Sequence, residues 1–168
     1  MPALYDVSVP AFVRGLQNLS AMLEKARAFA AEQGLDTAEL LDARLIADMA
    51  PLTRQIQMVT DTAKFVAVRV AQVENELWAD DEASFDDAQA RVAKAIAFLQ
   101  KMPADGFEDR EDAKVVLTTP SGDIPFTGST YVYGFAIPNF YFHLSMAYAL
   151  LRMKGVPLGK LDFLGAIR

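Results

Sequence analysis

The only histidine of this 168-residue chain, His143, lies in the stretch NFYFHLSMAY, residues 139–148. An imidazole has the ordinary pKa closest to neutrality, so it is the first candidate for acid–base chemistry or metal binding. The chain has no cysteine, which excludes disulfides, thiolate metal sites and a nucleophilic thiol. Chemistry near neutral pH therefore depends on what surrounds His143.

The residues around His143 predict a helix over 138–154. Pro138 suits its first turn, Gly155 suits its C-terminal cap, and Arg152 and Lys154 suit the negative end of its dipole. His143 shares one face of this helix with the mainly apolar residues Asn139, Phe140, Met146, Ala147 and Leu150. We therefore expect His143 to point into the core, either as a neutral hydrogen-bonded imidazole or as a metal ligand.

A metal site would need more ligands than this helix offers. A second ligand usually lies one turn away, and those positions hold Asn139 and Ala147. Asp61, with Gln57 one turn before it, is the nearest carboxylate on another helix. The helical count places Asp61 almost opposite the apolar stripe, where pairing with Lys64 or Arg54 explains it as well. We expect no resident metal, with His143 as the one ligand if a metal binds.

Hydrophobic periodicity and capping residues predict the elements that position these side chains. The expected helices cover residues 8–33, 38–48, 52–73, 84–102 and 138–154. Strands are expected at 115–119 and 124–127 around the turn PSGD, with Pro125 indicating an edge. The sequence predicts one all-α domain over residues 1–168, a four-helix bundle with a small β-hairpin inserted at about 114–128.

Two hydrophobic residues of the expected helix 52–73 do not fit its apolar stripe. Met58 and Phe65 fall almost opposite that stripe. Either the hairpin covers them or they form a homodimer contact. The following stretch, residues 74–87, has seven acidic residues and no lysine or arginine, and we interpret it as a solvated interhelix loop that ends in a Ser84-x-x-Asp87 capping box.

Charge and hydropathy exclude several kinds of partner. The net charge of −6 and the pI near 4.7 have the wrong sign for binding nucleic acid. No apolar run reaches about 18 residues, and the N-terminal residues do not have the pattern of a signal peptide. We expect a cytoplasmic protein that binds neither nucleic acid nor membrane.

Several segments together resemble a known bacterial family. They are YDVSVPAFVRGL at 5–16, PLTRQIQ at 51–57 with DTAK at 61–64, PNFYFH at 138–143 with AYALLR at 147–152, and DFLG at 162–165. This pattern is similar to domain-of-unknown-function family 1993, a distant relative of the DinB/YfiT-like superfamily. The resemblance implies a four-helix bundle that is often dimeric. In that superfamily three histidines commonly hold a divalent metal, and some members are thiol-dependent transferases.

The metal site that the resemblance implies is incomplete in this chain. His143 matches one position on the last helix, Asn139 or Phe140 stands near the other, and the second helix has no histidine. We expect a homodimer with a degenerate pocket used for small-ligand binding or for structure. The pocket candidates are Gln57, Asp61, Asn139, Tyr141 and His143.

Two alternatives stay open. The first is a divalent-metal-dependent thiol transferase that uses His143 and a zinc, nickel or manganese ion. The second is an interaction protein in which Met58 and Phe65 form the interface.

Overall fold

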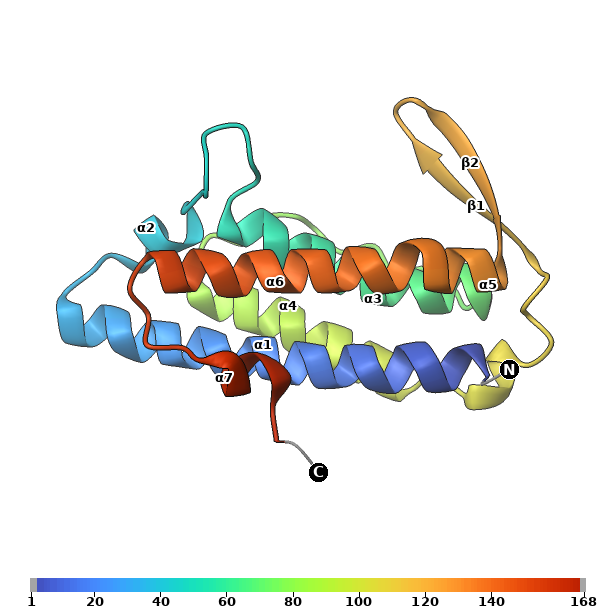
Figure 1. The fold of residues 1–168 in the computed structure, drawn as a ribbon, viewed down its shortest axis with the longest axis horizontal. Helices are drawn as coiled ribbons and strands as arrows, with labels where there is room; N and C mark the ends of the chain where they lie inside the picture. Colours follow the sequence, from blue (N-terminus) through green and yellow to red (C-terminus); the bar gives the residue numbers. More distant parts are fainter. Residues whose placement is uncertain (1–2, 167–168) are drawn as a thin grey trace.

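Four long helices form the body of the protein, as predicted (Figure 1). The computed structural model describes residues 3–166, so the two ends of the predicted domain, residues 1–2 and 167–168, lie outside the described residues. The long helices are α1 (Leu4–Gln33), α3 (Leu52–Val70), α4 (Phe85–Gln100) and α6 (Ile137–Met153). The all-α class and the bundle are confirmed.

Short elements connect and extend the four helices. They are α2 (Thr37–Leu41), η1 (Ala104–Phe107), β1 (Lys114–Thr119), β2 (Gly122–Thr127), α5 (Gly128–Tyr131), the π-helical turn η2 (Val132–Ala136) and α7 (Lys160–Leu164). The two strands pair antiparallel, with Val116 opposite Pro125. Each strand is therefore an edge, which tolerates the proline as the sequence indicated.

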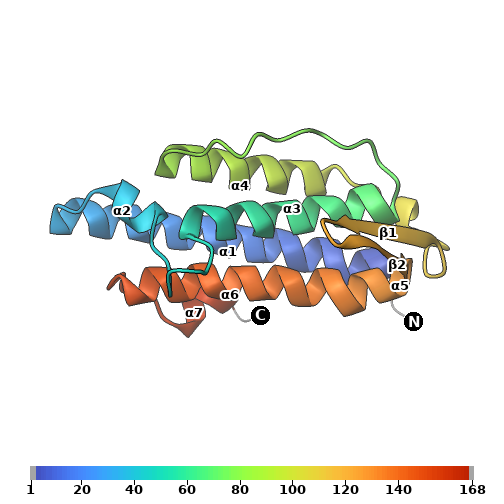
Figure 2. The ribbon, with the colours of Figure 1, turned by 90° about the horizontal axis from the view of Figure 1, so that it is seen from above.

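The four long helices do not simply alternate in direction along the chain. Figures 1 and 2 show α1 and α6 running one way and α3 and α4 running the other way. Because consecutive helices α3 and α4 are parallel, the chain must return the whole length of α3, about 28 Å, before α4 begins. Residues 71–84 make this return as a nearly extended chain, which can span up to about 46 Å. We call residues 72–83 the strap.

The core follows the periodicity of the sequence. Phe12 of α1 and Phe140 of α6 are both fully buried and stack with their ring centroids 4.4 Å apart. Gly15 lies beside this pair, and a Cβ atom at Gly15 would come within 2.6 Å of the Phe140 ring. The absence of a side chain at Gly15 thus lets α1 and α6 approach closely enough to bury both rings.

Two predicted boundaries in the N-terminal half are wrong. Helix α1 begins at Leu4 and not at Ser8, whose hydroxyl donates to the Leu4 carbonyl inside the helix. Pro10 lies within α1 and leaves the carbonyl of Asp6, four residues before it, without its helical donor. Helix α2 ends at Leu41 and not near 48, and residues 43–50 form an irregular protruding segment.

Helix α6 begins at Ile137 with Pro138 in its first turn, as predicted. The sequence did not indicate that helical backbone already starts at Gly128 with α5 and continues through the π turn η2 into α6. The wide π turn directly precedes Pro138, which can neither donate a backbone hydrogen bond nor tolerate the carbonyl four residues before it. This extra helical segment carries Tyr131 and Phe135.

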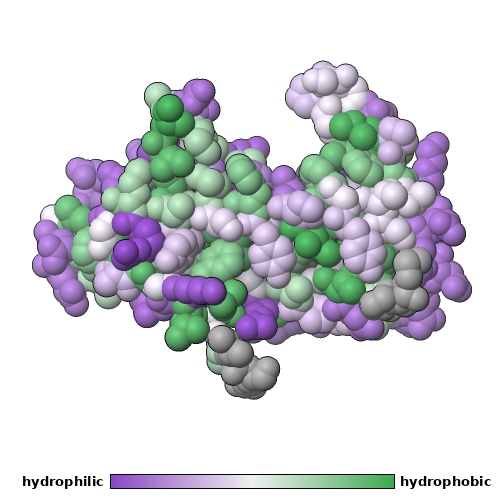
Figure 3. All heavy atoms as spheres, in the orientation of Figure 1, coloured by the Kyte–Doolittle hydropathy of each residue, from purple (hydrophilic) through white to green (hydrophobic). Residues whose placement is uncertain are grey.

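Two protrusions rise from the same side of the bundle, at opposite ends of α3 and α6 (Figure 1). One is the segment 43–50 and the other is the β-hairpin, and Figure 3 shows hydrophobic residues on both. Leu45, Ile46, Val116 and Ile124 are exposed there. Within residues 3–166, no helix has the length and apolarity to cross a lipid bilayer.

Candidate functional site

His143 is held by a single hydrogen bond from α6 to α3. Its side chain is only 8% exposed, and Nδ1 lies 2.8 Å from Oε1 of Gln55. An amide oxygen accepts hydrogen bonds and cannot donate them, so Nδ1 carries the proton and Nε2 keeps its lone pair. Nε2 has no hydrogen-bond partner among residues 3–166.

The surroundings of His143 keep the imidazole neutral. Burial lowers its pKa below the ordinary value of 6.5, and the positive charge of Arg54 lowers the pKa further. His143 is therefore an uncharged group at neutral pH, with one free acceptor nitrogen.

Asn139 lies one turn before His143 on the same face of α6. Its amide nitrogen donates to the Thr62 hydroxyl of α3 at 2.8 Å, and that hydroxyl donates to the Met58 carbonyl at 2.6 Å. The amide oxygen of Asn139 accepts no hydrogen bond from the residues that the structure describes. Asn139 and His143 thus each offer an unused acceptor along α6.

These groups border a cavity of about 240 Å³ between α3, α6 and the base of the hairpin. The cavity is lined by Met58, Asp61, Thr62, Phe65, Arg69, Leu117, Tyr131, Phe135, Asn139 and His143. Three of the five predicted pocket residues, Asp61, Asn139 and His143, therefore meet in one place. Met58 and Phe65, predicted as interface residues, are half-buried and form part of its wall.

Gln57 and Tyr141 lie outside this cavity. Gln57 turns toward the strap, where its amide nitrogen donates to Glu82 at 2.7 Å. Tyr141 is exposed and borders a hollow between α1, α6 and α7. Gln57 lies two positions after Gln55 on α3, and Tyr141 lies two positions before His143 on α6. Two positions on a helix correspond to a rotation of about 200°, so these two side chains point away from the cavity.

Sequence reasoning missed Gln55, which is the direct partner of His143. One signal was available, because Gln55 is a polar residue on the buried stripe of α3, three positions after Leu52. Arg69 was also missed, and its contact with Tyr131 was not foreseen. No local pattern could reveal them, since their meeting depends on the helical segment before Pro138 that the sequence did not indicate.

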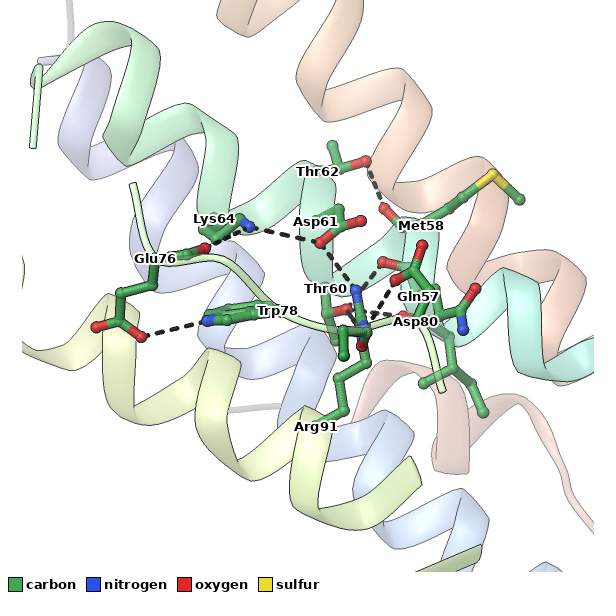
Figure 4. Close-up of polar contacts among 12 residues, drawn as sticks. Gln57, Met58, Thr60, Asp61, Thr62, Lys64, Glu76, Trp78, Asp80 and Arg91 are labelled. Carbon is green, nitrogen blue, oxygen red and sulfur yellow. Dashed lines mark hydrogen bonds and ion pairs between the residues drawn. The ribbon is translucent and has the colours of Figure 1, made fainter. Parts of the chain in front are cut away.

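Asp61 is engaged by cations on the side of α3 that faces the strap (Figure 4). Its carboxylate lies 2.9 Å from Nη2 of Arg91 and 3.8 Å from Nζ of Lys64. Burial raises the pKa of Asp61, and the charges of Arg91 and Lys64 oppose that shift. Asp61 thus lines the cavity, but the cations that balance its charge, Arg91 and Lys64, lie outside the cavity.

The strap is the solvated interhelix loop that its composition predicted, since most of its residues are exposed, but it is also attached to the bundle at specific points. Arg91 binds the strap residues Asp80 at 3.0 Å and Glu82 at 2.8 Å, and Lys64 donates to the Glu76 carbonyl at 3.0 Å. Trp78 is half-buried (Figure 4). Ser84 caps α4 as predicted, since its hydroxyl accepts from the Asp87 backbone at 3.1 Å, but the Asp87 carboxylate accepts from the Ala83 backbone at 3.1 Å in place of the Ser84 backbone.

The side chains do not fit the metal site that the resemblance implied. Among the described residues, no three His, Cys, Asp or Glu side chains lie together as a metal would require. Of these residue types only His143 and Asp61 border the cavity, and Asp61 is bound to Arg91 and Lys64. A catalytic zinc ion requires three protein ligands, so this donor set is insufficient.

Comparison with known proteins agrees with this architecture. The family model described as "Domain of unknown function (DUF1993)" matches residues 4–164. This chain belongs to the DUF1993 family. The DUF1993 chain is also similar to a solved structure, the crystal structure of a DinB family member from Shewanella denitrificans, with 35% sequence identity and a TM-score of 0.87. That match covers 98% of this chain and 93% of the other.

The similarity supports the DUF1993 fold as a relative of the DinB bundles. No functionally curated protein matches this DUF1993 sequence significantly. Its function must therefore be argued from its own site.

Proposed function

We propose that this protein binds a small organic molecule in the cavity between α3, α6 and the hairpin, and that it acts as a cytoplasmic homodimer. One observation carries the proposal: His143 and Asn139, each with an acceptor that no described residue uses, line a cavity whose other walls include Met58, Phe65 and Phe135. A largely apolar wall with a few convergent polar groups is the usual composition of a small-molecule site.

Binding without a metal accounts for the side chains better than metal-dependent transfer. A divalent-metal-dependent thiol transferase would need a third zinc, nickel or manganese ligand beside His143 and Asp61. Gln55 occupies the position on α3 that faces His143, and its oxygen already accepts from Nδ1. We therefore propose that no such ion takes part in the function of the pocket.

A ligand screen tests this function. We expect at least one class of metabolite in a broad library to raise the melting temperature of the wild-type protein, because a ligand that binds only the folded state stabilises it. Asn139→Ala should lose most of that shift, since it removes an acceptor at the cavity wall. Ser145→Ala, at an exposed position of α6, is the matched control and should keep the shift.

A library that gives no shift with the wild type would contradict the proposed function. So would an equal shift in Asn139→Ala, because the ligand would then bind elsewhere.

The proposed dimer rests on exposed apolar residues of the two protrusions and of α6. Ile46 on one protrusion is 60% exposed, and Ile124 on the other is 44% exposed. Phe142 of α6 is 54% exposed. A second copy packed on this face would bury these side chains, and burial of apolar surface favours association.

A further inference from the structure

Arg69 is a cation without an anionic partner in the part of the chain that the structure describes. It lies in the last turn of α3 and is half-buried. The ion pairs of residues 3–166 include none to Arg69. Its guanidinium carbon lies 4.3 Å from the centre of the Phe65 ring and 5.5 Å from that of Tyr131. A guanidinium carries five N–H donors, and the one side-chain acceptor found here for Arg69 is the Tyr131 hydroxyl.

Tyr131 holds the Arg69 guanidinium in place from within the core. Its hydroxyl accepts from Nη1 of Arg69 at 2.7 Å, and no described residue accepts the hydroxyl proton. Burial raises the pKa of Tyr131 although Arg69 opposes the shift, so the hydroxyl remains protonated at neutral pH. Tyr131 is fully buried and orients Arg69, whose half-buried guanidinium borders the cavity with donors that no anion among residues 3–166 receives.

The Asp61 carboxylate in the cavity wall does not pair with Arg69. Asp61 is eight residues before Arg69 on α3, which corresponds to about 12 Å along the helix. Arg91 and Lys64 already balance its carboxylate. The end of the cavity near Arg69 is therefore positive, and the aromatic rings beside it lower the local polarity and strengthen the attraction for an anion.

We propose that the pocket selects small organic acids, with the carboxylate bound by Arg69. The apolar body of the ligand then lies against Phe65, Leu117 and Phe135, which line the rest of that end. The cavity volume of about 240 Å³ is below the range of about 300–1,000 Å³ typical of drug-sized ligands, so it suits small acids. This inference rests on the proposed function, because it names the class of molecule that the same cavity binds.

Matched acids and amides test the charge preference directly. The probes are 3-phenylpropionate and hexanoate, each compared with its primary amide, which has the same shape without the charge. Affinities are measured by NMR titration of the full chain. We expect each acid to bind about 10-fold to 100-fold more tightly than its amide, because a hydrogen bond to a charged group contributes more than one between neutral groups.

Substitutions assign the preference to Arg69. Arg69→Gln should bring acid and amide to similar affinities while amide binding persists. The control Arg152→Gln, at an exposed arginine near the end of α6, should keep the wild-type ratio. If Arg69→Gln does not fold, Arg69→Lys must weaken the acid more than the amide, since lysine lacks the planar fork that binds a carboxylate with two bonds.

The outcomes separate this inference from the proposed function. Equal affinities of acid and amide for the wild type, or a preference that survives Arg69→Gln, would overturn the selection of acids while leaving a small-molecule cavity intact. Failure of both acids to bind at millimolar concentration would also overturn it. The proposed function would then be judged by the metabolite screen and Asn139→Ala.

Discussion

At the scale of single residues, the hydrogen bond between His143 and Gln55 determines what the site can do. Because Nδ1 is committed to Gln55, His143 can offer only an acceptor at Nε2. The sequence predicted that this histidine points inward, and its low exposure confirms that prediction. The tautomer could not be predicted, since it depends on a glutamine 88 positions earlier in the chain.

His143 should make stability depend on pH in a defined window. The folded protein lowers the pKa of His143 below 6.5, so as the pH falls through about 6.5 the unfolded chain takes up a proton that the folded chain resists. The free energy of unfolding should therefore fall with decreasing pH from about 6.5 down to the lowered pKa. Above about pH 7.5 both states are neutral and this contribution is absent.

Urea unfolding of the wild type and of His143→Gln between about pH 8 and pH 5 measures this contribution. His143 is the only histidine. The difference between the two curves of unfolding free energy against pH therefore reports this residue, while the contributions of other titrating groups, including Asp61, cancel. Parallel stability curves would show that His143 titrates alike in both states.

At the scale of elements, the parallel pair α3 and α4 creates the need for the strap, and Arg91 attaches it. The periodic stripes of α1, α3 and α4 predicted the existence of those helices because burial repeats every three or four residues. The direction of α4 relative to α3 has no such local signal. The acidic composition predicted the exposed loop, but the cations of α3 and α4 that attach it could not be predicted from that composition.

Arg91→Met should strongly destabilise the protein. The Arg91 side chain is 3% exposed and the Glu82 side chain 7% exposed, so the substitution leaves buried negative charge without a partner. Breaking a buried ion pair in this way costs about 3–5 kcal/mol. Urea unfolding should show this loss, and limited proteolysis should show faster cleavage within residues 72–83.

The matched control for Arg91 is Arg27→Met. Arg27 pairs with the exposed Asp86 on the bundle surface, and surface pairs contribute little. If the two variants were equally stable, the strap would not depend on Arg91.

At the scale of the whole molecule, the family resemblance predicted the bundle, and the structure and the comparison both support it. The cavity could be predicted only in part. Asp61, Asn139 and His143 converge because α3 and α6 pack along their length. The wall near Arg69 arises from the hairpin and the π turn, whose placement depends on the entire chain.

The proposed dimer predicts a solution mass of twice the 18.4 kDa of one chain. Ile46→Asp and Phe65→Asp should each shift the light-scattering mass toward the monomer, because a charge buried in an apolar contact is costly. Met58→Asp should act in the same direction.

The control for the dimer is Leu77→Asp. Leu77 is 90% exposed on the strap, away from the two protrusions, so the mass should not change. A wild type that scatters as one chain at all concentrations would exclude the dimer.

The placement of Trp78 gives the protein an internal optical reporter. It is the only tryptophan, and Lys64, Arg91 and Lys94 lie within 6 Å of its indole ring while Phe98 meets the ring edge-on. The emission spectrum of the native protein therefore reports a single fluorophore held among cations on the strap. Detachment of the strap would move that fluorophore into water, so fluorescence can distinguish local release of residues 72–83 from unfolding of the bundle without any attached dye.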